Sequence, residues 1–137
     1  MALVDNLIYM ITPATANVPA NSVLPLSTIA RRTGRILKSS SDSIILGAPG
    51  YYKVTASITF TAPEAGVAEF KMQKASSDIP GITASESVVT ATTEYHTVTL
   101  SGIVRIMPFD SASVLTILNS GIEINTSNIS FDVEYLG

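Results

Sequence analysis

Residues that commonly carry out catalysis are scarce in this chain of 137 residues. It holds one histidine, His96, and no cysteine, so it offers no thiolate nucleophile, no disulfide and no cysteine zinc site. The sequence has no Gly-x-Ser-x-Gly elbow, no Gly-x-x-x-x-Gly-Lys phosphate loop and no EF-hand pattern. We therefore expect no enzyme and no cofactor. We expect His96 to lie half-exposed beside Tyr95, the alternative being a metal held by one His96 from each copy of an oligomer.

Asp132 and Glu134 are the carboxylates most nearly arranged as a pair. Glycoside cleavage needs two carboxyl groups that face each other across a cleft. Here they alternate with Phe131, Val133 and Tyr135, which puts the two acids on one face of a strand and the apolar residues on the other. This alternation favours a solvated outer face over an acid–base pair.

The strongest local charge feature is a basic patch, which places four of the eight Lys and Arg residues within eight positions: Arg31, Arg32, Arg35 and Lys38. Arginine binds carboxylates through two parallel hydrogen bonds, so the patch predicts contact with an acidic partner surface, while a solvated loop remains the alternative. Nucleic acid is not an expected partner, because the net charge is −3 and no aromatic residues for base stacking alternate with the arginines.

The elements that must position these residues read as short strands. Residues 52–60 alternate strictly, with Tyr52, Val54, Ile58 and Phe60 on one face. Further strands are expected at 67–72, 98–106 and 129–135, and shorter ones at 7–11, 23–26, 36–37, 44–46, 87–91 and 114–118. Turn signals between them every 8 to 15 residues or so predict an all-β, antiparallel two-sheet β-sandwich of about eight to ten strands.

One domain is expected over the whole chain, with residues 1–16 as an N-terminal arm or first strand and residues 17–137 as the sandwich. The apolar run at 7–11 is far shorter than the roughly 20 residues that cross a bilayer, so no membrane partner is expected. An arm that holds the protein on a larger particle would use the aliphatic residues Leu3, Val4, Leu7, Ile8 and Ile11.

Three stretches carry a family resemblance. Residues 44–54, IILGAPGYYKV, match the pattern I-x-L-x-x-x-G-x-Y-x-V, in which Gly50 makes the turn into a strand. Residues 100–104, LSGIV, match x-S-G-x-V, and residues 18–26 place a small-residue turn before an apolar pair. In these motifs the chain resembles the tumour-necrosis-factor-like jelly roll, and especially the complement-type globular heads that also occur on phage fibres.

This resemblance implies a jelly roll that assembles as a homotrimer, with aromatic residues in the core or in the trimer interface: Tyr52, Phe60, Phe131 and Tyr135. Charged residues make up 14% of the chain, against about 25% in a typical soluble domain, so part of the exterior is expected to be covered by other copies. These features favour a non-enzymatic virion structural protein, made in the host cytoplasm and bound to a capsid or another virion protein. It would be a trimeric capsid decoration (cement) protein or a fibre head.

The alternative function is a receptor- or carbohydrate-binding head of a phage fibre. In it, exposed loops at 76–83 and 86–93 would contact a host receptor or a glycan. Aromatic side chains provide the flat faces on which sugars stack. Four tyrosines could form such a platform, although packing in the core or in an interface is their other interpretation: Tyr51, Tyr52, Tyr95 and Tyr135.

Overall fold

The computed structural model describes residues 7–13, 15–34, 36–89, 92–108 and 113–137, with the backbone alone at 37–39, 92 and 93. In these residues it has twelve strands and no helix, so no helix there could cross a membrane. Sheet A contains β1 (Leu7–Thr12), β2 (Ala16–Val18), β4 (Thr28–Thr33), β7 (Gly50–Ala62), β10 (Thr92–Ile106) and β12 (Ile124–Tyr135). Sheet B contains β3 (Ser22–Val23), β5 (Leu37–Ser40), β6 (Ser43–Leu46), β8 (Gly66–Lys74), β9 (Ser77–Val88) and β11 (Ser113–Asn119).

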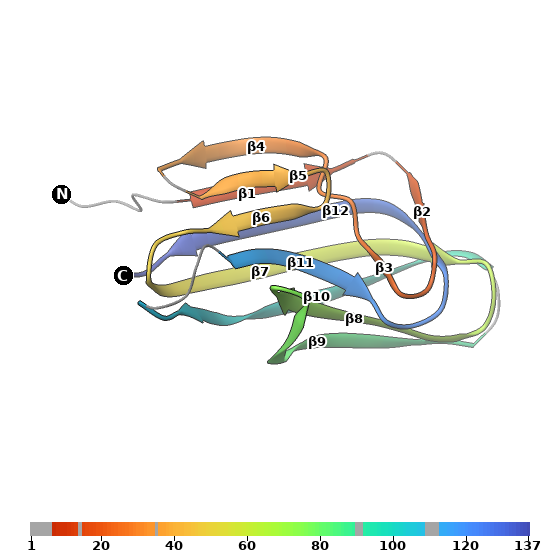
Figure 1. Cartoon of the computed structure of the whole chain (residues 1–137). Helices are drawn as coiled ribbons and strands as arrows, with labels where there is room; N and C mark the ends of the chain where they lie inside the picture. Colours follow the sequence, from red (N-terminus) through yellow and green to blue (C-terminus); the bar gives the residue numbers. More distant parts are fainter. Residues whose placement is uncertain (1–6, 14, 35, 90–91, 109–112) are drawn as a thin grey trace.

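The two sheets form a jelly-roll sandwich in which every described strand pair is antiparallel (Figure 1). The strand order is β10-β7-β12-β1-β4 in sheet A and β5-β6-β11-β8-β9 in sheet B. The edge strands β10 and β9 contact each other across the sandwich. The predicted fold class is therefore confirmed.

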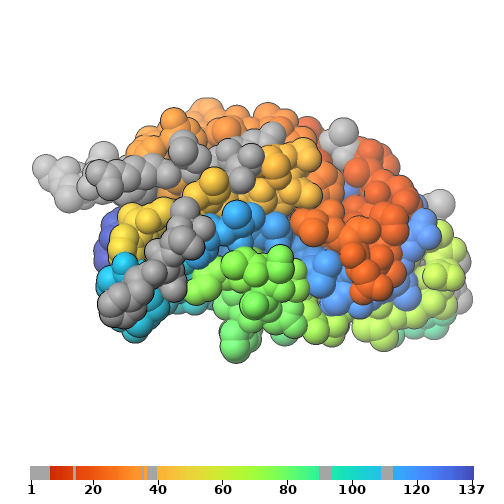
Figure 2. Space-filling model, viewed as in Figure 1, coloured from red at the N-terminus to blue at the C-terminus, as the bar shows by residue number. Residues whose placement is uncertain are grey.

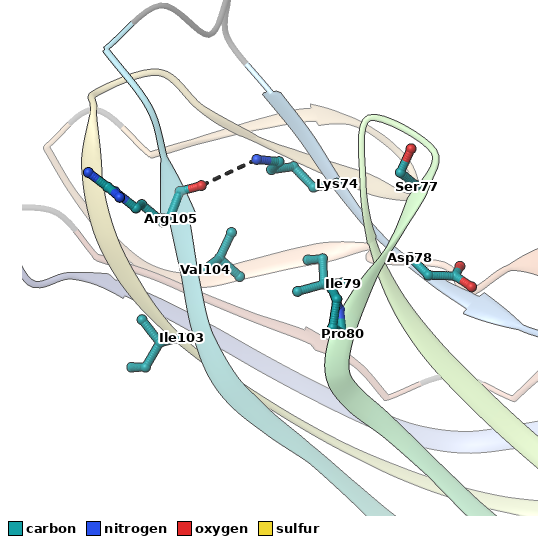
Figure 3. Close-up of a pocket in the computed structure, with 8 residues that line it drawn as sticks. All are labelled: Lys74, Ser77, Asp78, Ile79, Pro80, Ile103, Val104 and Arg105. Atoms are coloured by element: carbon teal, nitrogen blue, oxygen red, sulfur yellow. Dashed lines mark hydrogen bonds between the residues drawn. The ribbon is translucent and has the colours of Figure 1, made fainter.

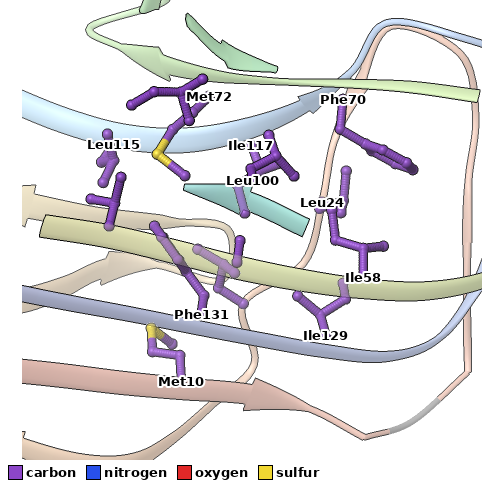
Figure 4. Close-up of a cluster of buried hydrophobic side chains, with 14 of the residues drawn as sticks. Met10, Leu24, Ile58, Phe70, Met72, Leu100, Leu115, Ile117, Ile129 and Phe131 are labelled. Carbon is purple, nitrogen blue, oxygen red and sulfur yellow. The ribbon is translucent and has the colours of Figure 1, made fainter. Parts of the chain in front are cut away.

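The core lies between the sheets and is made by alternate residues of the long strands (Figure 4). In β7 every second side chain from Tyr52 to Ala62 is buried, as the alternation of the sequence predicts. Phe60 of sheet A meets Phe70 of sheet B edge to face, with ring centroids 5.5 Å apart. Such a contact is a favourable arrangement for two aromatic rings and joins the two sheets.

The predicted turn before β7 is confirmed. Gly50 has a φ of +133°, a conformation that residues with a Cβ rarely adopt. Two tyrosine hydroxyls hold the backbone that leads into it. Tyr52 donates a hydrogen bond to the Ala48 carbonyl at 2.6 Å, and Tyr135 donates one to the Pro49 carbonyl at 2.7 Å.

Two stretches that the sequence allows to be interpreted as loops contain strands. The basic patch was open to interpretation as a loop, but Arg31 and Arg32 lie in β4, which pairs with β1. Residues 76–83 and 86–93 are expected from the sequence as exposed loops, whereas residues 77–83 and 86–88 belong to β9 and residues 92–93 begin β10. Pro80 does not end that strand because β9 is an edge strand, where a residue without an N–H is tolerated, and Gly81 takes up the bend with a φ of +83°.

Candidate interaction surfaces

The outward side of sheet A is covered at its centre by hydroxyl side chains. One cross-strand row, Thr99–Ser57–Ser130, runs across β10, β7 and β12. The hydroxyl oxygens of another cross-strand pair, Thr59 and Thr97, lie 3.0 Å apart. We call this surface the hydroxyl face and define it as Thr55, Ser57, Thr59, Thr97, Thr99, Ser101 and Ser130. Because these side chains carry no charge, another molecule can cover the hydroxyl face without desolvating an ion.

The predicted carboxylates border this face. Asp132 pairs with Thr55, and Glu134 with Lys53, while Phe131 and Val133 point into the core, so the predicted split between the two sides of the strand is confirmed. Both acids are only partly exposed. Partial burial, followed by repulsion from Glu134, raises the pKa of Asp132 above its usual value. No facing acid lies across a cleft from them in the described strands, which is the arrangement that glycoside cleavage needs.

A group of exposed apolar side chains lies at one end of the same side of sheet A. Tyr51 is 45%, Ile103 52% and Leu136 55% exposed. Leu136 donates its backbone N–H to the Tyr51 carbonyl at 2.8 Å, and the Arg105 guanidinium lies over the Tyr51 ring, 5.3 Å from its centroid. We call these four residues the corner cluster. Sequence reasoning did not group them, because they are brought together only by the pairing of β7 with β10 and with the C-terminal segment.

Of the four aromatic residues predicted for the core or the interface, three are core residues of a single chain. Tyr52, Phe60 and Phe131 are at most 1% exposed, and burial raises the pKa of the Tyr52 hydroxyl. Tyr135 is half-buried against the Tyr52 ring, with centroids 5.0 Å apart.

The four tyrosines do not form one platform. Tyr52 is buried, and Tyr95 lies ten positions before Arg105, the residue that pairs with Tyr51. That separation along β10 is about 33 Å. A sugar that contacts Tyr51 is therefore out of reach of Tyr95.

The basic patch is only partly described. Arg31 and Arg32 are exposed on β4, an outermost strand of sheet A, and each donates to a nearby carbonyl, of Ala30 at 2.8 Å and of Gly34 at 2.7 Å respectively. Arg35 lies outside the described residues, and Lys38 is described only in its backbone, as part of β5 in sheet B. A joint role of the four residues stays a prediction.

The aliphatic arm residues are also divided. Leu3 and Val4 lie outside the described residues. Leu7, Ile8 and Ile11 belong to β1, which is paired with β12 on one side and β4 on the other, and Ile8 is fully buried. From Leu7 onward the segment is thus a first strand rather than a free arm, which is one of the two predicted alternatives, and a role of these residues in holding a particle stays a prediction.

His96 faces the interior rather than lying half-exposed as predicted. Its side chain is 16% exposed and stacks on Phe60, with ring centroids 5.5 Å apart. Nδ1 lies 3.7 Å from a carboxylate oxygen of Glu86, and Nε2 is buried with no hydrogen-bond partner among the residues that the structure describes. Among the described residues no group of His, Asp and Glu side chains could hold a metal ion. A site built from several copies stays untested.

Comparison with known proteins finds similarity in structure only. No protein-family model matches the chain, and no curated protein is similar to it in sequence. The Eiger TNF of S. frugiperda is 9% identical, with a TM-score of 0.74 over 96% of this chain and 91% of that one. The globular domain of zebrafish complement 1qA is 7% identical, with a TM-score of 0.70 over 96% and 98%.

A third similar structure is the PRD1 vertex protein P5. It is 16% identical, with a TM-score of 0.62 over 99% of this chain and all of that one. At these identities the likeness concerns the fold. The chain thus has a tumour-necrosis-factor-like jelly roll, and the resemblance carried by residues 44–54 and 100–104 is confirmed at that level.

Proposed function

We propose that this protein is a non-enzymatic virion structural protein that assembles as a homotrimer and serves as a capsid decoration protein or a fibre head. The observation that carries the proposal is the likeness to a viral vertex protein over 99% of this chain and the full length of that one. The likeness to TNF and complement heads supports a head domain of the same type.

The hydroxyl face supports assembly. Interfaces of standard size bury about 800 Å² on each partner, a little over a tenth of the 6935 Å² that one chain exposes. Central side chains without charge can be covered at low desolvation cost. The low content of charged residues, 14%, also favours assembly, because a chain with few charged side chains has fewer of the groups that normally form a solvated surface.

Attachment to the particle is proposed for the other end of sheet A. Arg31 and Arg32 are consecutive, exposed residues of β4, an outermost strand of sheet A, so an acidic surface of a capsid protein that meets this edge could contact either guanidinium group. Each guanidinium can bind a carboxylate through two hydrogen bonds.

The first test is the mass of the protein in solution at micromolar concentration. We expect three times the 14.4 kDa of one chain; a stable single-chain particle would contradict the proposal. The second test is binding to capsids that lack the protein. Arg31→Glu with Arg32→Glu should lose binding while keeping the trimer mass, and Lys71→Glu, on β8 of sheet B, is the charge-reversal control. Unchanged binding of the arginine variant would remove these residues from the contact.

The alternative, a receptor- or glycan-binding head, makes a different prediction. It requires saturable binding of the trimer to a defined saccharide or host receptor, which a glycan array would detect. Tyr95, 66% exposed, is the aromatic residue to test first, because Tyr95→Ala should then abolish that binding.

A further inference from the structure

A pocket of about 270 Å³ opens beside the turn between β5 and β6. Its wall is formed by that turn together with β2 of sheet A and β3 of sheet B. In the space-filling view the orange surface of the segment with β2 and β3 borders the amber surface of β6 (Figure 2). Pockets for small ligands measure about 300–1,000 Å³, so this one suits a single side chain. We call it the acidic pocket and define it by its polar lining residues, Asn17, Ser22, Ser41 and Asp42.

The acidic pocket differs in charge from the pocket between β9 and β10. The latter, of about 290 Å³, lies where β9 bends at Gly81, and its lining includes Lys74 and Arg105 (Figure 3). The acidic pocket has no Lys or Arg among its described lining residues, and it has the carboxylate of Asp42. A positively charged ligand therefore complements the acidic pocket, and an anion does not.

Hydrogen bonds fix the turn that carries this carboxylate. Leu26 donates its backbone N–H to the Ser41 carbonyl at 2.8 Å. The Ser40 hydroxyl donates to Asp42 Oδ1 at 2.7 Å and accepts from the Asp42 N–H at 3.4 Å. Asp42 Oδ2 has no partner in the part of the chain that the structure describes. The carboxylate is thus held in place by one oxygen and offers the other to a ligand.

The remaining polar groups of the acidic pocket also offer acceptors. The Asn17 amide nitrogen donates to Glu123 Oε2 at 2.8 Å and to Asn125 Oδ1 at 3.0 Å, so the amide oxygen is its free group. The hydroxyls of Ser22 and Ser41 have no hydrogen-bond partner among the described residues, and a hydroxyl can accept as well as donate. A ligand with several donors therefore suits these groups, and Glu123 adds a second carboxylate next to the pocket.

The rest of the lining is apolar. Val18, Pro19, Val23 and Pro25 line the acidic pocket, and Val18 is 2% exposed. The aliphatic stem of a long basic side chain packs on such a surface while its charged end reaches polar groups. An ammonium has three donors and a guanidinium has five, with no acceptor. A guanidinium can therefore serve more of the acceptors in this pocket, and its planar fork matches a carboxylate.

We propose that the acidic pocket binds the guanidinium group of an arginine side chain that a partner polypeptide presents. The guanidinium lies at Asp42 Oδ2 and the serine hydroxyls, and the stem of the arginine packs on the prolines and valines. The acidic pocket shares no residue with the hydroxyl face or with Arg31 and Arg32. Arginine binding there is therefore independent of the proposed trimer and of its attachment to a particle.

A nuclear magnetic resonance titration of the isotopically labelled full chain tests this proposal. The ligand is Nα-acetyl-arginine N-methylamide, and the matched ligand is the citrulline analogue, which has nearly the same shape and no charge. We expect saturable shifts of the backbone amides of Val23, Ser41 and Asp42 with the arginine compound, and none of similar size around Lys74 and Arg105. Equal shifts with citrulline, or no saturable shifts at the acidic pocket, would overturn the proposal.

Asp42→Asn provides the second measurement. The asparagine keeps an oxygen that can accept from Ser40, so the turn should persist, and the spectrum away from the acidic pocket should be unchanged. Loss of the charged partner should weaken binding of the arginine compound about tenfold. Asp78→Asn is the matched control, because it removes a carboxylate that lines the other pocket, and it should leave the affinity unchanged. An affinity that is the same in Asp42→Asn and in the natural protein would contradict the assignment.

The source of the guanidinium is tested with agmatine, which has the same head group and no peptide groups. Weaker binding of agmatine than of the capped arginine supports a polypeptide partner. Tighter binding of agmatine would contradict a polypeptide partner and assign the acidic pocket to a free guanidinium compound.

Discussion

Ile82 of β9 packs so closely on Gly102 of β10 that no side chain fits at position 102. A Cβ there would lie 2.7 Å from Cγ1 and 2.8 Å from Cδ1 of Ile82. The two residues belong to different sheets, so their contact closes the sandwich along the edge where β9 meets β10. The x-S-G-x-V motif thus has a packing reason here: its glycine makes room for an isoleucine from the opposite sheet.

Gly102→Ala should therefore destabilise the fold. Forcing one extra carbon into this contact is expected to cost about 1–3 kcal/mol of unfolding free energy, measured by urea denaturation. Gly47→Ala is the matched control, since nothing lies within 4 Å of a Cβ at that position. Ile82→Val should recover part of the loss in the double variant. Equal stabilities of the Gly102 and Gly47 variants would show that Ile82 moves aside at no cost.

Tyr52→Phe should lower the unfolding free energy by about 0.5–1.5 kcal/mol. The variant keeps the buried ring but loses the 2.6 Å hydrogen bond to the Ala48 carbonyl. Tyr135→Phe loses a similar bond to the Pro49 carbonyl at an exposed position, where water can replace the hydroxyl, so its loss should be smaller. The reverse ranking in a urea titration would mean that the Tyr52 hydroxyl contributes little to the turn at Gly50.

Asp132→Asn should make the protein more stable at neutral pH. Burial, and then Glu134, raise the pKa of Asp132 in the folded chain above its ordinary value of 3.8. Between the ordinary pKa of the unfolded chain and the raised pKa of the folded chain, the folded state binds more protons than the unfolded state. The stability that the protonated Asp132 contributes is therefore lost as the pH rises through the pKa of the folded state. The variant should remove that part of the pH dependence.

Melting temperatures of the natural protein and of Asp132→Asn between pH 4 and pH 7 check this. The curves should converge at the acidic end and separate towards neutrality, with the variant higher. Glu64→Gln, in an exposed turn, controls for the removal of a negative charge. A variant that melts below the natural protein at pH 7 would show that the ionised carboxylate is stabilised there.

Ser57→Glu should dissociate the proposed trimer. Ser57 lies at the centre of the hydroxyl face, between Thr99 and Ser130. Burying one carboxylate from each copy would cost on the order of several kcal/mol. The solution mass should drop from three chains to one. Ser85→Glu, exposed on β9 of the other sheet, should leave it unchanged. A trimer that survives Ser57→Glu would place the interface elsewhere.

Strands with one buried side could be predicted from the sequence, because their pattern is local. Strand β7 shows this best, since Tyr52, Val54, Ile58 and Phe60 alternate with polar residues and all four are buried. Strand β4 escaped prediction because an edge strand exposed on both sides has no reason to alternate, and its Arg31 and Arg32 look like loop residues. Strand β9 escaped because Pro80-Gly81 resembles a turn in the sequence.

The candidate surfaces depend on which strands pair, and this cannot be obtained from local patterns. His96 faces inward because β10 places it opposite Phe60 of β7. The corner cluster combines Tyr51 with Leu136, which are 85 positions apart in the chain. The pocket between β9 and β10 needs the bend at Gly81 together with the end of β10. Each of these arrangements depends on the long-range register of the sheets.

Arg31 and Arg32 on β4 have a consequence for solubility at high density. In the part of the chain that the structure describes, β4 pairs only with β1, and such unpaired edges can join those of other molecules into amyloid-like fibrils. If two β4 strands paired edge to edge, arginines of both copies would come close along the seam, and their repulsion would oppose the growth of such a ribbon. Crowded copies of this all-β protein are thereby less prone to aggregate along this edge.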